Sequence, residues 1–165
     1  MQAKEQVIKH VVWRIATDTP DYTADDLTGA GAKITGGRWN RPGTALLYCA
    51  ENIALACLET FVHVKSAGLP LNRYLVRLTI PDAIWAAATH MTATSAPIGW
   101  DAIPTGKVSL DSGDAWAATG ASALLFIPSV IIPEERNILI NPLHADAKNI
   151  TATKIRKWLY DPRMG

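Results

Sequence analysis

The stretch from Gly36 to Ala50 constrains the fold more than any other, because it requires a tight loop, a turn and a strand in quick succession. Its sequence is Gly-Gly-Arg-Trp-Asn-Arg-Pro-Gly-Thr-Ala-Leu-Leu-Tyr-Cys-Ala. The two leading glycines relax the steric limits on φ, and Pro42-Gly43 turns the backbone. The apolar run that follows predicts a strand over residues 45–50, interrupted only by the phenol of Tyr48.

A helix that carries one carboxylate is predicted directly after this strand. Asn52 suits an N-cap, and apolar residues recur at helical spacing up to about Lys65. The predicted apolar face consists of Ile53, Ala54, Cys57, Leu58, Phe61, Val62 and Val64. Glu59 falls on the remaining narrow polar face beside His63, so periodicity alone makes it a solvated residue. A catalytic role for Glu59 requires that this face look into a cleft.

Three consecutive elements thus supply a guanidinium, a phenol and a carboxylate, from Arg38, Tyr48 and Glu59. If a loop, a strand and a helix bring these groups together, the site suits an anionic ligand that contains a ring.

Two further candidates lie outside this segment. Arg14, within a predicted strand over residues 11–15, is either a solvent-facing residue or a second cation that lines the same pocket as Arg38. Ser129 follows Pro128 at a predicted strand end, and on local grounds it is a strand-end or turn hydroxyl.

The remaining pattern is irregular and predicts an α+β fold. Further strands are predicted over residues 72–80, 122–127, 137–142 and 154–160, and a helix over 110–119, while the pattern of 82–107 is weak. About six strands and two or three helices in this order favour a bent or split mixed β-sheet over a regular βαβ array. Residues 1–165 are expected to form a single domain.

Composition excludes several classes of function. With 48% hydrophobic and 19% charged residues and a net charge of +1, the chain lacks the basic excess of proteins that grip nucleic acid. No apolar run approaches the ~18 residues of a membrane span, and no signal core follows the amino terminus, so a cytoplasmic protein is expected. Cys49 and Cys57 are too few for a disulfide framework and are expected to be buried thiols.

Common catalytic and metal-binding motifs are missing from the sequence. The four histidines and two cysteines lack zinc-type spacing, so no metal is expected. A phosphate-binding loop, a dinucleotide glycine motif and a nucleophile elbow are absent as well, and Ser129 has no local support as a nucleophile.

Several pieces taken together resemble the RES-domain family, which is named after an arginine, a glutamate and a serine. They are Gly-Gly-Arg38-Trp-Asn, Tyr48, Glu59, Pro128-Ser129 and Asn137-Ile-Leu-Ile-Asn141-Pro-x-His144. The similarity extends from Trp13-Arg14 to Asp161-Pro162-Arg163. Matched residue by residue, the named trio falls on Arg38, Glu59 and Ser129, with Tyr48 and Arg14 completing the pocket.

The resemblance implies a toxin of a bacterial toxin–antitoxin pair with an ADP-ribosyltransferase-like fold. Its substrate would be NAD, cleaved at the nicotinamide–ribose bond by hydrolysis or phosphorolysis, with phosphate as co-substrate in the second case and no bound cofactor. The alternative is ADP-ribosylation of a cellular protein, and a lower alternative is a non-catalytic module that binds a nucleotide or partner. The implied partner is a cognate Xre-type antitoxin that blocks the active site.

The resemblance also suggests a role for each candidate. Glu59 would stabilise a ribosyl oxocarbenium ion, and Arg38, with Arg14, would bind the diphosphate. Tyr48 would stack on the nicotinamide or ribose, and Ser129 would position the substrate rather than attack it.

Overall fold

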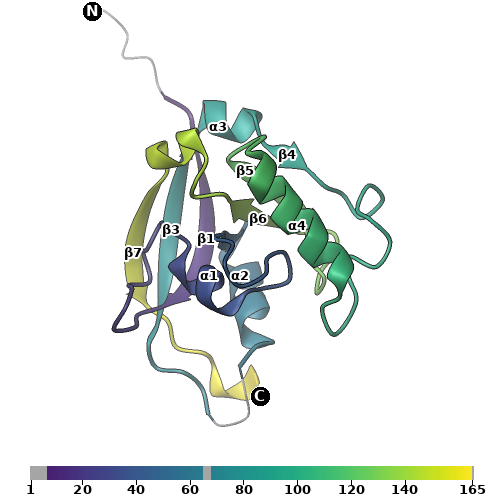
Figure 1. Cartoon of the computed structure of the whole chain (residues 1–165). Helices are drawn as coiled ribbons and strands as arrows, with labels where there is room; N and C mark the ends of the chain where they lie inside the picture. Colours follow the sequence, from purple (N-terminus) through teal and green to yellow (C-terminus); the bar gives the residue numbers. More distant parts are fainter. Residues whose placement is uncertain (1–6, 65–67, 165) are drawn as a thin grey trace, which may run out of the picture.

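One seven-stranded sheet organises the computed structural model, which describes residues 7–64 and 68–164 (Figure 1). The strand order is β4-β5-β6-β2-β1-β3-β7, and β4 is parallel to β5 while the other neighbours are antiparallel. The strands are β1 (Lys9–Thr17), β2 (Leu47–Ala50), β3 (Arg73–Pro81), β4 (Thr89–His90), β5 (Leu124–Pro128), β6 (Arg136–Ile140) and β7 (Thr151–Lys157). The helices are α1 (Ala30–Thr35), α2 (Ile53–Phe61), α3 (Asp82–Ala86) and α4 (Lys107–Thr119), with 3-10 turns η1 (Ala145–Asn149) and η2 (Pro162–Met164).

The sheet is nearly divided between β1 and β2. These two strands share one residue pair, Trp13 opposite Ala50, whereas β1 pairs with β3 along its whole length. In Figure 1, β1, β3 and β7 stand side by side at the left, and β5 and β6 run across the view behind α4. The predicted α+β fold with a split sheet is therefore confirmed.

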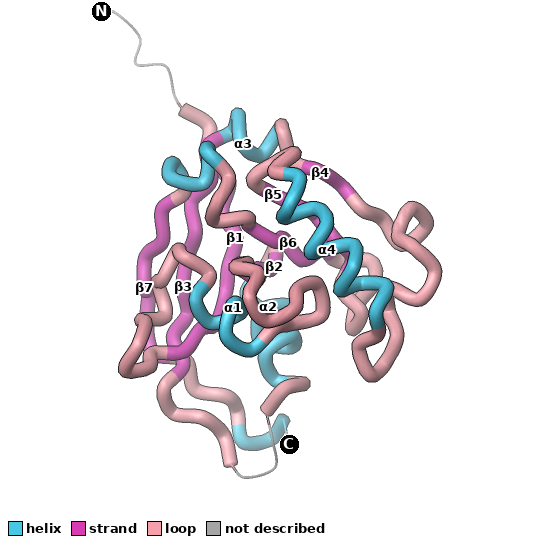
Figure 2. The backbone as a smooth tube through the Cα atoms, in the orientation of Figure 1, coloured by secondary structure: helices cyan, strands magenta, loops and turns pink. Residues whose placement is uncertain are grey.

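Alternation along the strands buries apolar residues on both faces of the sheet. One face holds Val12, Cys49 and Phe126 and is covered by α3 through Ile84. The other face is covered by α2 at the β1–β2 joint and by α4 over β5 and β6. Figure 2 shows that α2 and α4 lie apart in space, with α4 in front of β5 and β6. Both cysteines are buried and free, which confirms that prediction.

The helix α2 begins as predicted but ends earlier. Asn52 accepts a hydrogen bond from the backbone N–H of Leu55 at 2.8 Å, so it is the N-cap. The helix ends at Phe61 instead of near residue 65, which lies outside the described residues. Cys57 is buried as predicted, and Ile53, Phe61 and Val64 pack in the same cluster. Packing across the split sheet also buries Leu55 and Ala56, whereas Ala54 and Val62 are exposed.

Other element boundaries shift for similar tertiary reasons. The predicted strand 154–160 is β7, which starts three residues earlier because pairing with β3 runs from Thr151 to Lys157. Tyr160 leaves the sheet, packs in the apolar cluster under α2, and its hydroxyl hydrogen-bonds that of Thr60 at 2.6 Å. The short elements α1, α3 and β4 were not predicted, because a few residues carry too little periodicity. No helix within the described residues is long and apolar enough to cross a membrane.

The helix α4 presses against the loop of residues 36–43. A Cβ atom at Gly113 would lie 1.8 Å from the carbonyl oxygen of Trp39, so no larger residue fits. One helical position further, the Asp114 carboxylate accepts hydrogen bonds from the backbone N–H and the guanidinium of Arg41, at 3.1 and 2.9 Å. The loop is thus clamped between the sheet and α4.

Replacing Gly113 with Ala is expected to destabilise the protein, although the same change in an ordinary helix interior is stabilising. The added methyl must displace the Trp39 carbonyl, and overpacking of this kind costs about 1–3 kcal/mol. Urea unfolding of wild type and variant measures the difference. Gly106→Ala is the control, because its Cβ would meet only Ala102 at 3.7 Å. Equal or greater stability of the Gly113 variant would contradict the clamp.

Candidate active site

A buried amide fixes the loop that carries Arg38. Asn40 is fully buried, and its side-chain NH2 donates to the carbonyls of Ala32 and Thr44, each at 2.9 Å. Its Oδ1 accepts a hydrogen bond from the Tyr48 hydroxyl at 2.6 Å. The loop therefore has one defined conformation, because a buried amide left without these partners would be costly.

Tyr48 lies directly under this loop. Its hydroxyl accepts from the backbone N–H of Trp39 at 3.0 Å while donating to Asn40. A Cβ at Gly37 would come within 2.7 Å of the same oxygen, so the glycine permits the close approach. Burial raises the pKa of the phenol well above its ordinary value, against smaller lowering effects from the Trp39 N–H and from Arg38. The hydroxyl is thus engaged by the protein itself.

Arg38 extends from the loop toward the segment that precedes α4. Its Nη1 donates to the carbonyl oxygens of Trp100 at 3.2 Å and Ala102 at 2.8 Å. Within residues 7–64 and 68–164, Nη2 and Nε make no hydrogen bond. The half-buried guanidinium therefore keeps one edge for a ligand.

Glu59 is held through one of its two oxygens. Oε1 accepts hydrogen bonds from the hydroxyl of Ser129 and the side-chain NH2 of Asn137, both at 2.6 Å. Oε2 accepts none from the described residues. Short bonds to a carboxylate are among the stronger hydrogen bonds in proteins, so this half-buried side chain has a fixed orientation. It is not the freely solvated residue that helical periodicity alone suggested.

Ser129 is fully buried, and its hydroxyl uses all of its hydrogen-bonding capacity within the protein. Its hydroxyl donates to Glu59 and accepts from the backbone N–H groups of Ile131 and Ile132, each at 3.1 Å. It closes a turn after β5 and holds the carboxylate in place.

The strand register brings these groups to one face of the sheet. In the ladder of β2 and β6, Tyr48 lies opposite Leu139 and Ala50 lies opposite Asn137. Tyr48 and Asn137 are therefore diagonal neighbours on the same face, and such pairs lie about 7–8 Å apart. Tyr48 supports the loop that carries Arg38, and Asn137 binds Glu59, so the register places the two supports on the same face of the sheet.

Arg14 is not brought to this group. Every second residue of a strand faces the same side, so Arg14 shares the face of Val12 and Ala16, which is opposite to the face of Tyr48 and Glu59. On that face its charge lies near the thiol of Cys49. Burial raises the pKa of that thiol to about 12, and Arg14 partly opposes the rise. Arg14 Nη1 is buried without a hydrogen-bond partner in the described part of the chain.

Comparison with known proteins identifies the family of this chain. The RES domain model matches residues 11–162. The chain belongs to the RES domain family. It is 62% identical over 152 residues to a protein of Sphingobium sp. named "Prs ADP-ribosylating toxin". The aligned residues cover 92% of this chain and 94% of the relative.

More distant relatives carry a common name. A "Toxin Res" of Yersinia enterocolitica is 31% identical over 144 residues, covering 87% of this chain and 93% of the relative, and one of Pseudomonas putida is 30% identical over 141 residues, covering 84% and 89%. These findings confirm the predictions of a RES-domain toxin and of an enzyme.

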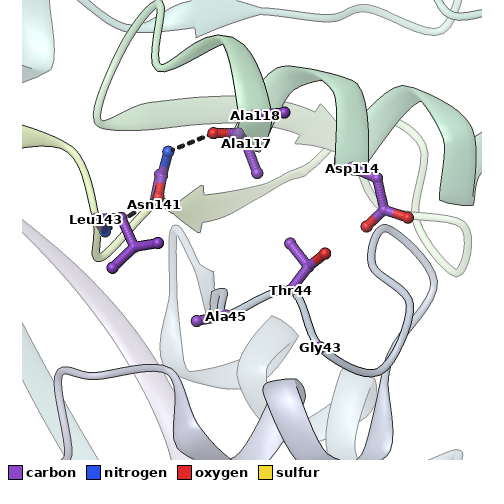
Figure 3. A pocket seen from close by; sticks show the side chains of 8 residues that line it. All are labelled: Gly43, Thr44, Ala45, Asp114, Ala117, Ala118, Asn141 and Leu143. Carbon is purple, nitrogen blue, oxygen red and sulfur yellow. Dashed lines mark hydrogen bonds between the residues drawn. The ribbon is translucent and has the colours of Figure 1, made fainter.

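A hollow on this RES domain lies apart from the predicted residues. It has a volume of about 200 Å³ and is lined by residues 43–45, α4 and the segment that follows β6 (Figure 3). Asp114 and Asn141 are its main polar side chains, and their hydrogen bonds go to the protein itself. The common hollow expected for Arg38, Tyr48 and Glu59 is not this one. Arg38 and Tyr48 are related through the loop of residues 36–43, and Glu59 is held separately by Ser129 and Asn137.

Asn137 received no role from its sequence. The Asn-Ile-Leu-Ile-Asn-Pro segment marked the region, but nothing local distinguished an amide that pairs with a carboxylate on another element. Only the position of α2 beside β6 makes that pairing visible.

Tyr48→Phe is expected to lower the stability of this RES domain by about 1–3 kcal/mol, because Asn40 Oδ1 and the Trp39 N–H would each lose a partner. Thermal unfolding measures the loss. Tyr74→Phe serves as control, since the Tyr74 hydroxyl makes no hydrogen bond among the described residues. The same small effect from both changes would contradict a structural role for the Tyr48 hydroxyl.

Proposed function

We propose that this chain cleaves the nicotinamide–ribose bond of NAD and transfers the ADP-ribosyl group to a protein. The single observation that carries the proposal is the Glu59 carboxylate, which is anchored at Oε1 by Ser129 and Asn137 and, among residues 7–64 and 68–164, free at Oε2. Family membership and the named relatives support it.

The chemistry suits one oriented carboxylate. Nicotinamide in NAD is already cationic, so it departs with the bonding electron pair as a neutral molecule and needs no acid. The ribosyl carbon left behind develops oxocarbenium character, which a nearby negative charge stabilises. Glu59 Oε2 would supply that charge and orient the incoming nucleophile. The nucleophile forms the new bond to the ribosyl carbon and releases its proton to solvent.

Arg38 suits the diphosphate of the same substrate. A guanidinium binds phosphate oxygens through paired, charge-assisted hydrogen bonds. Its Nη1 is tied to the carbonyls of Trp100 and Ala102, which fixes the plane of the fork and leaves its other donors available. Arg14 has a buried nitrogen that finds no partner in the described part of the chain, but it lies on the other face of the sheet, so we assign the diphosphate to Arg38 alone.

The name of the Sphingobium relative suggests the acceptor. Because that protein is 62% identical over nearly the whole chain, we propose that the acceptor here is also Prs. Hydrolysis and phosphorolysis share the bond cleavage and differ in the acceptor, which would be water or phosphate. An NAD-consuming enzyme harms its own cell, so we further propose the Xre-type antitoxin as the partner that blocks the site.

Wild-type protein incubated with adenylate-labelled NAD and purified Prs of Sphingobium sp. is expected to release nicotinamide and label Prs. Glu59→Ala is expected to lower both by about 10²-fold or more, because the charge that stabilises the transition state is lost. Ser129→Ala should cause a smaller loss, since Asn137 still holds the carboxylate.

Glu134→Ala is the matched control, because Glu134 is an exposed carboxylate in the turn between β5 and β6. Near wild-type nicotinamide release from Glu59→Ala would contradict the proposed stabilisation of the ribosyl cation by Glu59. Release of nicotinamide with free ADP-ribose, or with ADP-ribose 1''-phosphate when phosphate is added, and no labelled Prs would assign water or phosphate as acceptor.

Arg38→Lys is expected to raise the KM for NAD by about tenfold or more, because an ammonium cannot replace the planar fork. Steady-state nicotinamide release measures the change. Arg77→Lys, an exposed position on β3, is the control. An unchanged KM for Arg38→Lys would rule out paired recognition of the diphosphate by Arg38.

A further inference from the structure

The loop between β4 and α4 exposes two isoleucines. Ile98 is 98% exposed and Ile103 is 82% exposed. This loop extends to the right edge of the molecule in Figure 1. Isolated apolar side chains on a surface are common, so the exposure alone decides nothing.

The two isoleucines are presented by an anchored turn. Trp100 lies between them in the chain, is 6% exposed, and stacks on Trp39 with ring centroids 6.2 Å apart. The backbone N–H of Trp100 also donates to the carbonyl of Pro97 at 3.1 Å. The indole therefore fixes the turn, and Ile98 and Ile103 face water on either side of it.

The same turn contacts Arg38. The carbonyls that accept from its guanidinium belong to Trp100 and Ala102, so Ile103 follows one of them directly. The turn that carries both exposed isoleucines thus contacts, through its backbone, the group that we assign to the NAD diphosphate.

Exposed aliphatic side chains on an anchored turn are better suited to bind the surface of another protein than to bind a nucleotide. Burying such a side chain in an interface favours binding, and a rigid loop loses little entropy when it binds. A protein that accepts ADP-ribose must reach the ribose beside Glu59 while its surface rests on the rim of the NAD site.

We propose that Ile98 and Ile103 form the docking surface for the acceptor protein. The inference rests on the proposed function and extends it to a residue pair that determines which protein is modified. NAD cleavage itself does not involve these side chains.

The test is the double variant Ile98→Asp, Ile103→Asp. Labelling of Sphingobium Prs at a concentration below saturation is expected to fall about tenfold or more. The matching pair Ile98→Ser, Ile103→Ser, which adds no charge beside the diphosphate site, should also lower the labelling. Nicotinamide release by hydrolysis without Prs, with water as the acceptor, should stay within about twofold of wild type in this serine pair, because both side chains lie in solvent.

Leu143→Asp is the matched control. Leu143 is 84% exposed and lines the hollow near residues 117 and 118 of α4, whereas the Ile98–Ile103 turn precedes the start of that helix. Its labelling of Prs should equal that of wild type.

Unchanged Prs labelling by the double variant would overturn the docking proposal and leave the surface to another partner, such as the antitoxin. A parallel loss of labelling and Prs-independent nicotinamide release would overturn it too, because the loop would then belong to the NAD site. Wild-type nicotinamide release without any labelled Prs also overturns it, while NAD cleavage stands. Absence of nicotinamide release from wild type is the distinct result that removes the proposed function itself.

Discussion

The close approach of α4 to the loop of residues 36–43 is the constraint on which the site depends. Gly113 allows the Trp39 carbonyl to enter the space of a missing side chain, and Asp114 binds Arg41 one residue later. The loop in turn rests on the hydroxyl of Tyr48. Because helix, loop and strand fix one another, the guanidinium that projects from the loop has a defined direction.

The split in the sheet has an equally direct consequence for the carboxylate. With only Trp13 and Ala50 joining the two halves, α2 crosses the joint and reaches the side chains of β6. Glu59 then meets Asn137, and the turn after β5 adds the Ser129 hydroxyl. Both donors bind the same oxygen, so the other oxygen has a fixed position and accepts no hydrogen bond from the described residues.

Much of the fold followed from local patterns. Asn52 as N-cap, Gly120 as the end of α4, and the apolar runs of β5 and β6 are consequences of backbone chemistry and burial. The boundaries of α2 and β7 did not follow, because the stripe that a helix buries and the residues that a strand pairs depend on neighbours distant in sequence. The elements α1, α3 and β4 were missed because each is too short to show a period.

The sequence by itself determined the fold class, the family, and the residue types that the site needs, because glycine positions, apolar spacing and the order of Arg38, Tyr48 and Glu59 are local information. Only the tertiary structure decided how these groups are used. Register sets Arg14 on the opposite face, and packing makes the Tyr48 hydroxyl a support for the loop. Partners of buried polar atoms come from other elements, so no local pattern reveals that Asn137 and Ser129 converge on a single carboxylate oxygen.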